Sequence, residues 1–309
     1  MYLEHFGLKQ PPFNLIPDPD YLYLSGKHRL GLSLLRYGLT EAGGGLTVIS
    51  GHIGAGKTTL LRKLLQELDY SSLNVGLINN TADFPDHLIR WVASTFQLNY
   101  ENRESLAIFR DFQQYLIDQY ACGKQTVLII DEAQNLNEKS LEELRLLTNI
   151  NAERDQLLKI VLVGQPELLE ILSKPKLVQL AQRVSVEYHL EPLSLDDTRH
   201  YIHHRTQVAG AVTELFEESA IGAIFVLSGG VPRLINTLCD QALVYAFAME
   251  LPTADITAAL EVAKGRRIGG LNRFTPASEE IQQVRRDLHS RYGIDPGVLL
   301  DNHVANGTT

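Results

Sequence analysis

The segment Leu46–Leu60 reads LTVISGHIGAGKTTL, in which a short apolar run is followed by glycines and then by leucines at helical spacing. Its centre, from Gly51 to Thr58, fits the pattern GxxxxGK[ST]. Glycines at these positions let the backbone curl with its N–H groups pointing inward, which favours phosphate binding at the start of a helix. We therefore predict a phosphate-binding loop between a strand and a helix, with a glycine-rich turn that holds no ligand as the alternative.

The polar groups of this loop have separate expected tasks. Lys57 would place a positive charge on the phosphates and support catalysis, and the hydroxyl of Thr58 would be a ligand of Mg²⁺. Backbone N–H groups of the loop are expected to donate further hydrogen bonds to the phosphates. The predicted nucleotide-binding residues of the loop are Gly51, Gly54, Ala55, Gly56, Lys57, Thr58 and Thr59.

The composition indicates a soluble globular protein with a sizeable core. The chain has 309 residues, of which 44% are hydrophobic and 21% are charged, enough for one large domain or two smaller ones. Cys122 and Cys239 lack the spacing of a metal or redox pair, so we expect no disulfide and a cytoplasmic location. No secretion signal and no apolar run of ~20 residues occurs, so direct membrane insertion is not expected.

Strand and helix signals alternate between residues 27 and 192. Short apolar runs predict strands at residues 46–49, 73–78, 126–130, 157–163 and 184–190. Helical spacing of apolar residues predicts helices at residues 27–39, 60–68, 83–98, 104–120 and 139–150. Because strands that alternate with helices form a parallel sheet covered on both faces, we expect a doubly wound α/β nucleotide-binding domain over residues 27–192.

The strand signals stop after Pro192. Helical periodicity, with glycine and proline at the joints, predicts helices at residues 196–208, 214–227, 231–248 and 254–264. We therefore expect a small all-helical domain over residues 193–264, followed by a tail over residues 265–309.

The tail differs in charge from the rest of the chain. From Lys264 to Arg291 there are seven basic residues against three acidic ones, a net charge of +4, whereas the whole chain carries −9. The overall charge disfavours a generally basic nucleic-acid binder, yet a local basic patch is compatible with binding of duplex DNA. A solvated helix face and a docking site for an acidic partner are the alternatives.

Residues 1–26 combine four prolines, at positions 11, 12, 17 and 19, with aromatic residues between them. This combination excludes a regular helix and predicts an extended strap. Two roles are open for the strap. Its aromatic side chains pin it to a domain surface, or it closes over the nucleotide base.

Asp131 and Glu132 directly follow the buried-strand run at residues 126–130. Parallel strands end at one edge of the sheet, so these carboxylates are expected beside the phosphate-binding loop. Asp131 would hold Mg²⁺ directly or through water, and Glu132 would polarise a water molecule for attack on the γ-phosphorus. The alternative is that both residues cap the next helix.

Further motifs follow the loop GHIGAGKT in a recognisable order. They are TVLIIDEAQNL, LEELRLLTNI, IVLVGQPEL, LAQRV and SGGVPRLINTLCDQAL, and the chain opens with HFGLKQPPFNLIPDPDYLYLS. Over residues 1–264 this set resembles the AAA+ ATPases, and within them the ExeA-like branch of general secretion pathway proteins. ATPases that regulate DNA transposition are similar, but less closely. The resemblance implies a five-stranded core with a helical lid, ATP and Mg²⁺ as cofactors, and a homo-oligomeric ring or filament whose subunits share the ATP site.

The resemblance also implies roles for three polar residues. Gln165 matches the first sensor, which contacts the γ-phosphate or the attacking water, with a helix cap as the alternative. Arg233 matches the second sensor, which binds phosphate from the lid, with a surface arginine as the alternative. Arg183 is the candidate for an arginine finger that reaches the neighbouring subunit's nucleotide. Arg145 and Arg154 are its competitors, and a structural salt bridge is the alternative for Arg183.

A cluster of histidines does not indicate a metal site. His200, His203 and His204 fall on one predicted helix without further ligands at zinc spacing, so a solvated helix face is expected.

Two classes of function are consistent with these observations. The first is a cytoplasmic ATPase that hydrolyses Mg-ATP to assemble or remodel a secretion, pilus or polysaccharide-export system, held near the inner membrane by a protein partner. The second is an ATP-dependent regulator of transposition that assembles on duplex DNA. Longer ExeA-like proteins are expected to continue into a transmembrane helix and a peptidoglycan-binding domain, whereas this sequence ends at Thr309 after a short helix. Direct binding to the cell wall is therefore not expected of this sequence.

Overall fold

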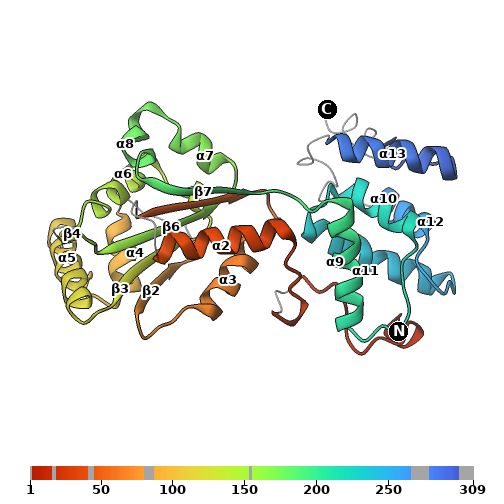
Figure 1. Ribbon diagram of the computed structural model, residues 1–309, viewed down its shortest axis with the longest axis horizontal. Helices are drawn as coiled ribbons and strands as arrows, with labels where there is room; N and C mark the ends of the chain where they lie inside the picture. Colours follow the sequence, from red (N-terminus) through yellow and green to blue (C-terminus); the bar gives the residue numbers. More distant parts are fainter. Residues whose placement is uncertain are drawn as a thin grey trace. The chain divides into compact units, whose positions relative to one another are not determined.

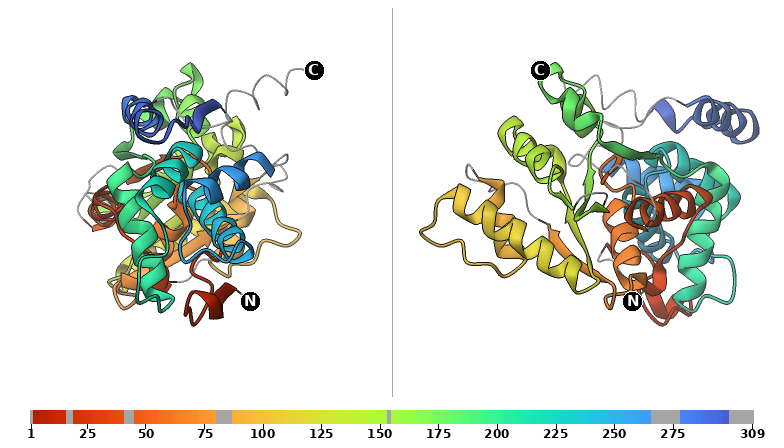
Figure 2. Two further views of the ribbon diagram at one scale, coloured as in Figure 1. Left: turned by 90° about the vertical axis from the view of Figure 1, so that its right-hand side faces the viewer. Right: turned by 60° about the vertical axis from the view of Figure 1, so that its left-hand side comes forward.

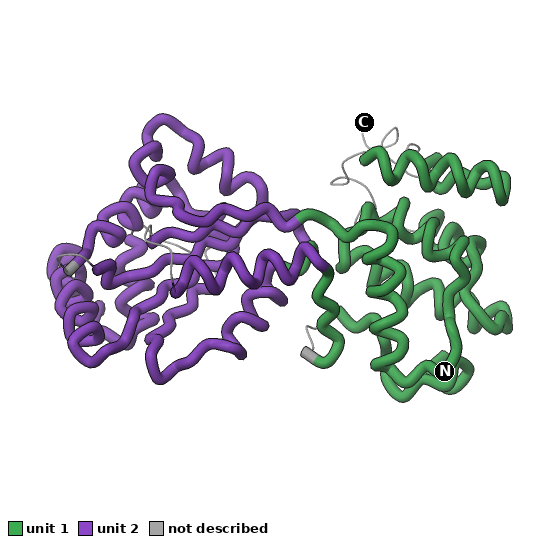
Figure 3. The backbone as a smooth tube through the Cα atoms, in the orientation of Figure 1, with its two compact units in different colours: residues 1–25, 54–56, 191–309 green, residues 26–53, 57–190 purple. Residues whose placement is uncertain are grey.

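The computed structural model describes residues 2–15, 19–40, 45–79, 87–152, 155–265 and 278–298. The chain divides into two compact units (Figures 1 and 3). Unit 1 comprises residues 1–25, 54–56 and 191–309, and unit 2 comprises residues 26–53 and 57–190. Among the described residues, no helix has the length and apolarity that crossing a bilayer requires.

Unit 2 is built on a five-stranded sheet with the order β2-β3-β6-β1-β7, and all neighbouring strands are parallel. The strands are β1 (Leu46–Gly51), β2 (Leu73–Ile78), β3 (Gln125–Ile130), β6 (Leu158–Gly164) and β7 (Val184–Leu190). Strands β1 and β6 are buried along their whole length, as expected for a sheet covered on both faces. All five predicted strands are present.

Helices cover both faces of this sheet. They are α2 (Gly26–Thr40), α3 (Lys57–Glu67), α4 (Leu88–Thr95), α5 (Ser105–Ala121), α6 (Glu138–Leu147), α7 (Glu167–Leu172) and α8 (Val178–Ala181), with 3₁₀ turns η2 (Ala133–Asn135) and η3 (Pro175–Leu177). Helices α2 and α3 pack on β1, whereas α4 packs on β2 and α5 on β3. The right-hand view of Figure 2 shows the yellow α5 and the orange α3 on opposite sides of the sheet. The predicted doubly wound α/β fold is confirmed.

Two features of unit 2 differ from the sequence-based expectation. The predicted helix at residues 83–98 is shorter, because only Leu88–Thr95 is helical among residues 87–98, and residues 83–86 lie outside the described part of the chain. A small hairpin of β4 (Asn151–Ala152) and β5 (Asp155–Gln156) was not predicted. Strands of two residues are too short to carry an alternating apolar pattern.

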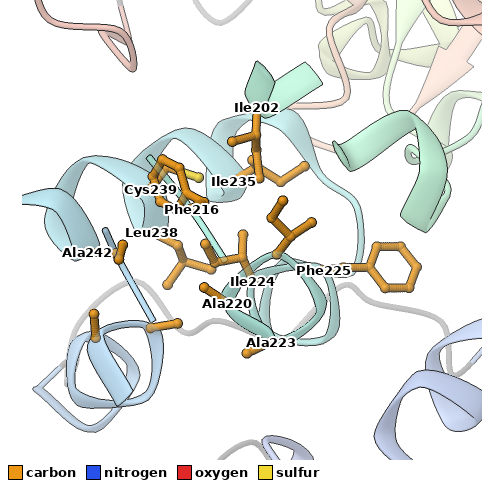
Figure 4. Packing of buried hydrophobic residues seen from close by; sticks show 14 of the residues in the cluster. Ile202, Phe216, Ala220, Ala223, Ile224, Phe225, Ile235, Leu238, Cys239 and Ala242 are labelled. Carbon is orange, nitrogen blue, oxygen red and sulfur yellow. The ribbon is translucent and has the colours of Figure 1, made fainter. Parts of the chain in front are cut away.

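Unit 1 contains the helices α9 (Leu195–Val208), α10 (Glu218–Ser228), α11 (Pro232–Ala248), α12 (Ile256–Gly265) and α13 (Glu279–Tyr292). Helix α10 is the centre of its core, because every residue from Ser219 to Ser228 is buried. A helix that is apolar on all sides is stable only when other helices surround it. Figure 4 shows Ile224 of α10 packed among Ile202, Ile235 and Leu238 from α9 and α11.

The strap contributes to the core of unit 1. Phe6, Phe13 and Tyr21 are buried and belong to the same apolar cluster as α10, which supports packing as the role of these side chains. The prediction that the strap contains no regular helix is wrong, since α1 (Tyr2–His5) and the 3₁₀ turn η1 (Pro19–Tyr21) are helical. Helix α1 lies before the first proline, and proline is compatible with the first position of a helical turn.

A buried arginine holds the strap in place. The guanidinium of Arg205, on α9, donates hydrogen bonds to the backbone oxygens of Pro12 at 2.6 Å and Asn14 at 3.1 Å. It also lies over the ring of Tyr21, 4.9 Å from the ring centre. Arg205 is 7% exposed, so its charge is stabilised by these contacts instead of by water.

Part of the predicted tail is a packed helix. Ile281, Val284 and Leu288 of α13 are buried against α10. On the same helix, Arg285 forms an ion pair of 2.9 Å with Asp295. Arg266, Arg267 and Arg273, which contribute to the predicted basic patch, lie outside the described residues.

Candidate nucleotide-binding site

The phosphate-binding loop connects β1 to α3, as predicted. Strand β1 ends at Gly51 and α3 begins at Lys57, so the loop leads directly into the N-terminus of a helix. Gly54 and Gly56 have backbone φ angles of +80° and +100°, in a region that residues other than glycine rarely adopt. At Gly51, a Cβ atom would lie 2.8 Å from the backbone oxygen of Leu190 on the neighbouring strand. The glycines of the motif are therefore required by backbone conformation and by space.

Lys57 is held beneath the loop by the loop's own backbone. Its Nζ donates hydrogen bonds to the oxygens of Gly51 at 2.7 Å and His52 at 3.1 Å. The side chain is buried, and this burial lowers the pKa of the Lys57 amine, although the carboxylates of Glu132 and Asp131 oppose the effect. A phosphate group would supply the negative charge that this buried cation needs.

Asp131 lies at the end of β3, beside the first turn of α3. Its backbone N–H donates to the oxygen of Ile78 at 2.9 Å, and its Oδ2 accepts a hydrogen bond of 3.0 Å from the hydroxyl of Thr58. Burial raises the pKa of the Asp131 carboxyl, against the hydrogen bonds that lower it. The hydroxyl and the carboxylate are oxygen ligands of the kind that Mg²⁺ prefers, so the pair fits the predicted metal site.

Glu132 follows Asp131 in an unusual backbone conformation. Its φ of +54° places it in the left-handed region, which residues other than glycine rarely adopt. Its Oε2 accepts a hydrogen bond of 3.3 Å from the side-chain amide of Gln165, at the end of β6. The fold thus brings the predicted base and the predicted first sensor together at one edge of the sheet.

Arg233 lies at the start of α11, in unit 1, together with the loop residues 54–56. Its backbone N–H donates to the oxygen of Gly54 at 3.3 Å. A Cβ atom at Gly54 would lie 2.6 Å from the Cβ of Arg233, so glycine is needed at Gly54 for this approach as well. The predicted second sensor therefore contacts the predicted phosphate-binding loop through its backbone.

Arg183 lies at the other end of the sheet. It precedes Val184, which pairs with Leu46 at the start of β1, whereas the loop follows Gly51 at the end of that strand. Five residues of strand separate the two ends by about 17 Å. The Arg183 guanidinium donates to the backbone oxygen of Thr148 at 2.9 Å and also to the side chain of Asn149.

The two competitors of Arg183 have different positions. Arg145 forms an ion pair of 2.8 Å with Glu142 on its own helix, and Arg154 lies outside the described residues. Among the described residues, which include the three histidines of α9, no group of three or more His, Cys, Asp or Glu side chains is placed so that it could hold a metal ion.

Sequence reasoning missed two groups of polar residues at this edge. Gln134 contacts both Glu132 and Gln165. Ser50 and His189 are paired across β1 and β7, and their side chains are 2.9 Å apart. The ring of His52 lies 5.8 Å from that of His189, and burial, then the proximity of His189 and Lys57, lowers the pKa of His52. The contact of Gln134 with Gln165 and that of Ser50 with His189 depend on the strand order, which no sequence pattern marks.

A pocket of about 610 Å³ lies elsewhere on unit 2, between α4, α5 and α6. Its lining includes Leu106, Phe109, Leu146 and Ile150, and it includes none of the predicted site residues. We therefore place the candidate site at the loop and not at this pocket.

Comparison with known proteins identifies relatives of this chain. An AAA domain model matches residues 40–172. General secretion pathway protein A of Aeromonas hydrophila is 44% identical over 249 residues, which are 80% of this chain and 45% of that protein. The chain thus spans less than half the length of this relative.

Solved structures share the fold at low identity. The ORC1 protein of Aeropyrum pernix in complex with DNA has a TM-score of 0.58 and 16% identity, covering 96% of this chain and 86% of its own. Cdc6p from Pyrobaculum aerophilum has a TM-score of 0.57 and 14% identity, covering 96% and 88%. The chain therefore contains an AAA domain and is a relative of general secretion pathway protein A.

Proposed function

We propose that this protein hydrolyses ATP at the loop formed by residues 51–59 and uses the energy to assemble or remodel a secretion-related complex. The observation that carries the proposal is the position of Glu132, a carboxylate beside the Thr58–Asp131 pair and within reach of Gln165. A site that only binds nucleotide needs the loop, but it does not need a base at this position.

In the proposed reaction, the loop and Lys57 bind the phosphates of ATP. Thr58 and Asp131 would hold Mg²⁺, which would supply positive charge to the phosphates. Glu132 accepts a proton from water as the water oxygen bonds to the γ-phosphorus and the bond to ADP breaks. Gln165 orients the water or the γ-phosphate, and Arg233 is the proposed second sensor, which binds phosphate oxygens.

The proposed activity can be tested with one near-isosteric substitution. Glu132→Gln keeps the size of the side chain but removes the base, so turnover should fall by about 10² to 10⁴ while ATP still binds. Glu104→Gln, on an exposed residue before α5, is the matched control and should keep wild-type turnover. Normal turnover in Glu132→Gln would refute the mechanism.

The proposed oligomer, cytoplasmic location and secretion role are supported by the relationship to general secretion pathway protein A. We expect the protein to form a ring or filament when ATP is bound, with Arg183 completing the site of the next subunit. Light scattering of Glu132→Gln with and without Mg-ATP tests this expectation. An unchanged mass with saturating ATP would refute the shared site.

A DNA-binding regulator is the alternative function, and the net charge of +4 between Lys264 and Arg291 favours it. Arg285 is already paired with Asp295, and Lys264 with Glu261, which reduces the charge available to DNA. Duplex DNA should be titrated at several salt concentrations with a slowly hydrolysed ATP analogue. Binding with a steep salt dependence that weakens when Arg266, Arg267, Arg285 and Arg286 are neutralised would favour this alternative.

A further inference from the structure

Gln134 connects the two strand ends that carry the proposed catalytic groups. Its side-chain Nε2 donates a hydrogen bond of 2.7 Å to Oε2 of Glu132. Its Oε1 accepts a hydrogen bond of 3.0 Å from the backbone N–H of Gln165. Gln134 itself lies in the 3₁₀ turn η2, between β3 and α6. One amide therefore links the end of β3 to the end of β6.

The orientation of this amide follows from its partners. The backbone N–H of Gln165 can only donate, so the oxygen of the Gln134 amide must face it. The NH₂ group then points the other way, toward the carboxylate of Glu132. A reversed amide would place two donors against each other and an oxygen against a carboxylate. The backbone of β6 thus determines that Glu132 receives a donor.

Gly164, at the end of β6, leaves room for the side chain of Gln134 because it has no side chain of its own. A Cβ atom at Gly164 would lie 3.0 Å from Oε1 of Gln134 and 2.9 Å from a methyl group of Leu168. Any larger residue at Gly164 would therefore displace the amide. The left-handed backbone of Glu132 complements this arrangement, because it directs the carboxylate toward η2 and β6.

We propose that Gln134 is a positioning residue for Glu132 in ATP hydrolysis. This inference rests on the proposed function. The amides of Gln134 and Gln165 bind the same carboxylate oxygen, Oε2, so together they fix the direction in which Glu132 points. Gln134 makes the shorter of the two bonds and is itself anchored to the backbone. Gln165, in contrast, has a side chain that is predicted to contact the nucleotide or the water.

The expected size of the effect follows from the cost of misplacing a base. A displacement of about 1 Å from the productive geometry can lower the rate by about 10²-fold. Loss of the bond from Gln134 leaves Glu132 partly positioned by its other contacts, so we expect kcat to fall by about 10- to 100-fold. The affinity for ATP should be unchanged, because Gln134 is not part of the phosphate-binding loop.

Two substitutions separate the bonds that Gln134 makes. Gln134→Met keeps the length of the side chain and removes both bonds, whereas Gln134→Glu keeps the acceptor for the Gln165 N–H and replaces the donor to Glu132 by a second carboxylate, which repels it. Both variants should show the lower kcat with an ATP Kd within about twofold of wild type. Gln114→Met and Gln114→Glu, on the exposed face of α5, are the matched controls.

A third measurement identifies the residue through which Gln134 acts. Single-turnover rates of Glu132→Gln with and without Gln134→Glu should differ by less than about twofold, since a positioning residue has no effect once its base is absent. Wild-type kcat in Gln134→Glu, or losses that multiply in the double variant, would overturn the inference. If Gln134→Met lowers the midpoint of thermal unfolding, Gln134→Glu alone decides the outcome.

The inference and the proposed function fail in different ways. If the wild-type protein does not hydrolyse ATP, or Glu132→Gln turns over normally, the proposed function is wrong and the inference falls with it. If Glu132→Gln is inactive but both Gln134 variants keep wild-type kcat, only the role of Gln134 is wrong.

Discussion

The hydroxyl of Thr58 donates a hydrogen bond of 3.0 Å to Oδ2 of Asp131, across 73 positions of sequence. This contact joins the first turn of α3 to the end of β3, so two oxygen atoms of the kind that Mg²⁺ prefers lie side by side. The same edge of the sheet holds Lys57 and Glu132. Each of these groups has a separate proposed role, and each can be removed separately.

Thr58→Val removes the hydroxyl and keeps the shape of the side chain. We compare the ratio of the ATP Kd without Mg²⁺ to the ATP Kd with Mg²⁺. This ratio should be at least about tenfold smaller in Thr58→Val than in wild type, the equivalent of ~1.4 kcal/mol, because one oxygen ligand of Mg²⁺ is lost. Titration of a fluorescent ATP analogue with and without Mg²⁺ measures the effect. Thr95→Val, on a half-buried residue at the end of α4, is the control. Equal Mg²⁺ dependence in Thr58→Val and wild type would contradict the assignment.

Lys57→Ala should weaken ATP binding by about 100-fold or more. Hydrogen bonds to a charged group contribute about 1.5–3 kcal/mol each, and the ammonium would make at least one to phosphate. The same titration gives the Kd. Lys63→Ala changes a lysine on the same helix that pairs with Glu67 at 3.2 Å, and it should bind ATP normally. An ATP affinity close to wild type in Lys57→Ala would show that the loop does not hold phosphate.

Asp131→Asn should raise the stability of the protein in the absence of nucleotide and Mg²⁺. Burial raises the pKa of the Asp131 carboxyl above its value in the unfolded chain, so the folded protein holds this proton more tightly. At neutral pH the ionised carboxylate therefore lowers the free energy of unfolding. This destabilisation by the ionised carboxylate decreases as the pH falls from the raised pKa of the folded protein toward the pKa of Asp131 in the unfolded chain. Asp131→Asn has no ionisable group at this position, so it avoids the destabilisation at every pH.

Urea denaturation of wild type and Asp131→Asn at pH 7 and near pH 4 tests this reasoning. The variant should be more stable at pH 7, and the difference should shrink at the lower pH. Asp118→Asn, on an exposed residue of α5, controls for the general loss of one negative charge. A wild-type protein that is more stable than Asp131→Asn at pH 7 would show that the hydrogen bonds to Asp131 outweigh its burial.

The sheet and the loop were predictable because both are encoded locally. Buried parallel strands are continuous apolar runs, and the curl between Gly51 and Lys57 needs glycine wherever it occurs. The place of Asp131 followed from one further rule, that parallel strands end at a common edge. The strap was predicted less well. Its prolines excluded a long helix, but they carried no information about the single turn at residues 2–5.

Gln134 could not be predicted from the sequence. Its amide contacts the backbone of Gln165, 31 positions away, and this contact exists only because β3 and β6 are neighbours in the sheet. No periodicity or motif encodes a bond between a side chain and the backbone of another strand. Arg205 was missed for the same reason, since its partners in the strap are more than 190 positions away.

Arg205→Met should release the strap from unit 1. The substitution keeps an apolar stem of similar length but leaves the backbone oxygens of Pro12 and Asn14 without this donor, at a cost of about 2–4 kcal/mol of stability. Limited proteolysis followed by mass spectrometry should show faster cleavage within residues 1–25. Arg110→Met, on an exposed residue of α5, is the control. Equal cleavage rates in Arg205→Met and wild type would show that the apolar contacts of Phe6 and Phe13 suffice to hold the strap.

Arg183 should act on the ATP of a neighbouring subunit, since it lies at the end of the sheet opposite to the loop of its own chain. An arginine finger contributes about 10³ to 10⁵ to turnover, so Arg183→Ala should be nearly inactive. Arg145→Ala, which removes a competitor, should retain activity.

Mixing two inactive variants distinguishes a shared site from a structural role of Arg183. Subunits with Glu132→Gln bind ATP and keep Arg183, so they should activate Arg183→Ala neighbours, which keep Glu132. In a random equimolar mixture, about one quarter of head-to-tail interfaces combine the intact halves, which sets the expected recovery. A mixture of Glu132→Gln with Lys57→Ala contains no complete site and should stay inactive. If Arg183→Ala has wild-type turnover, or if the first mixture recovers nothing, the hydrogen bonds of Arg183 to Thr148 and Asn149 are its whole role.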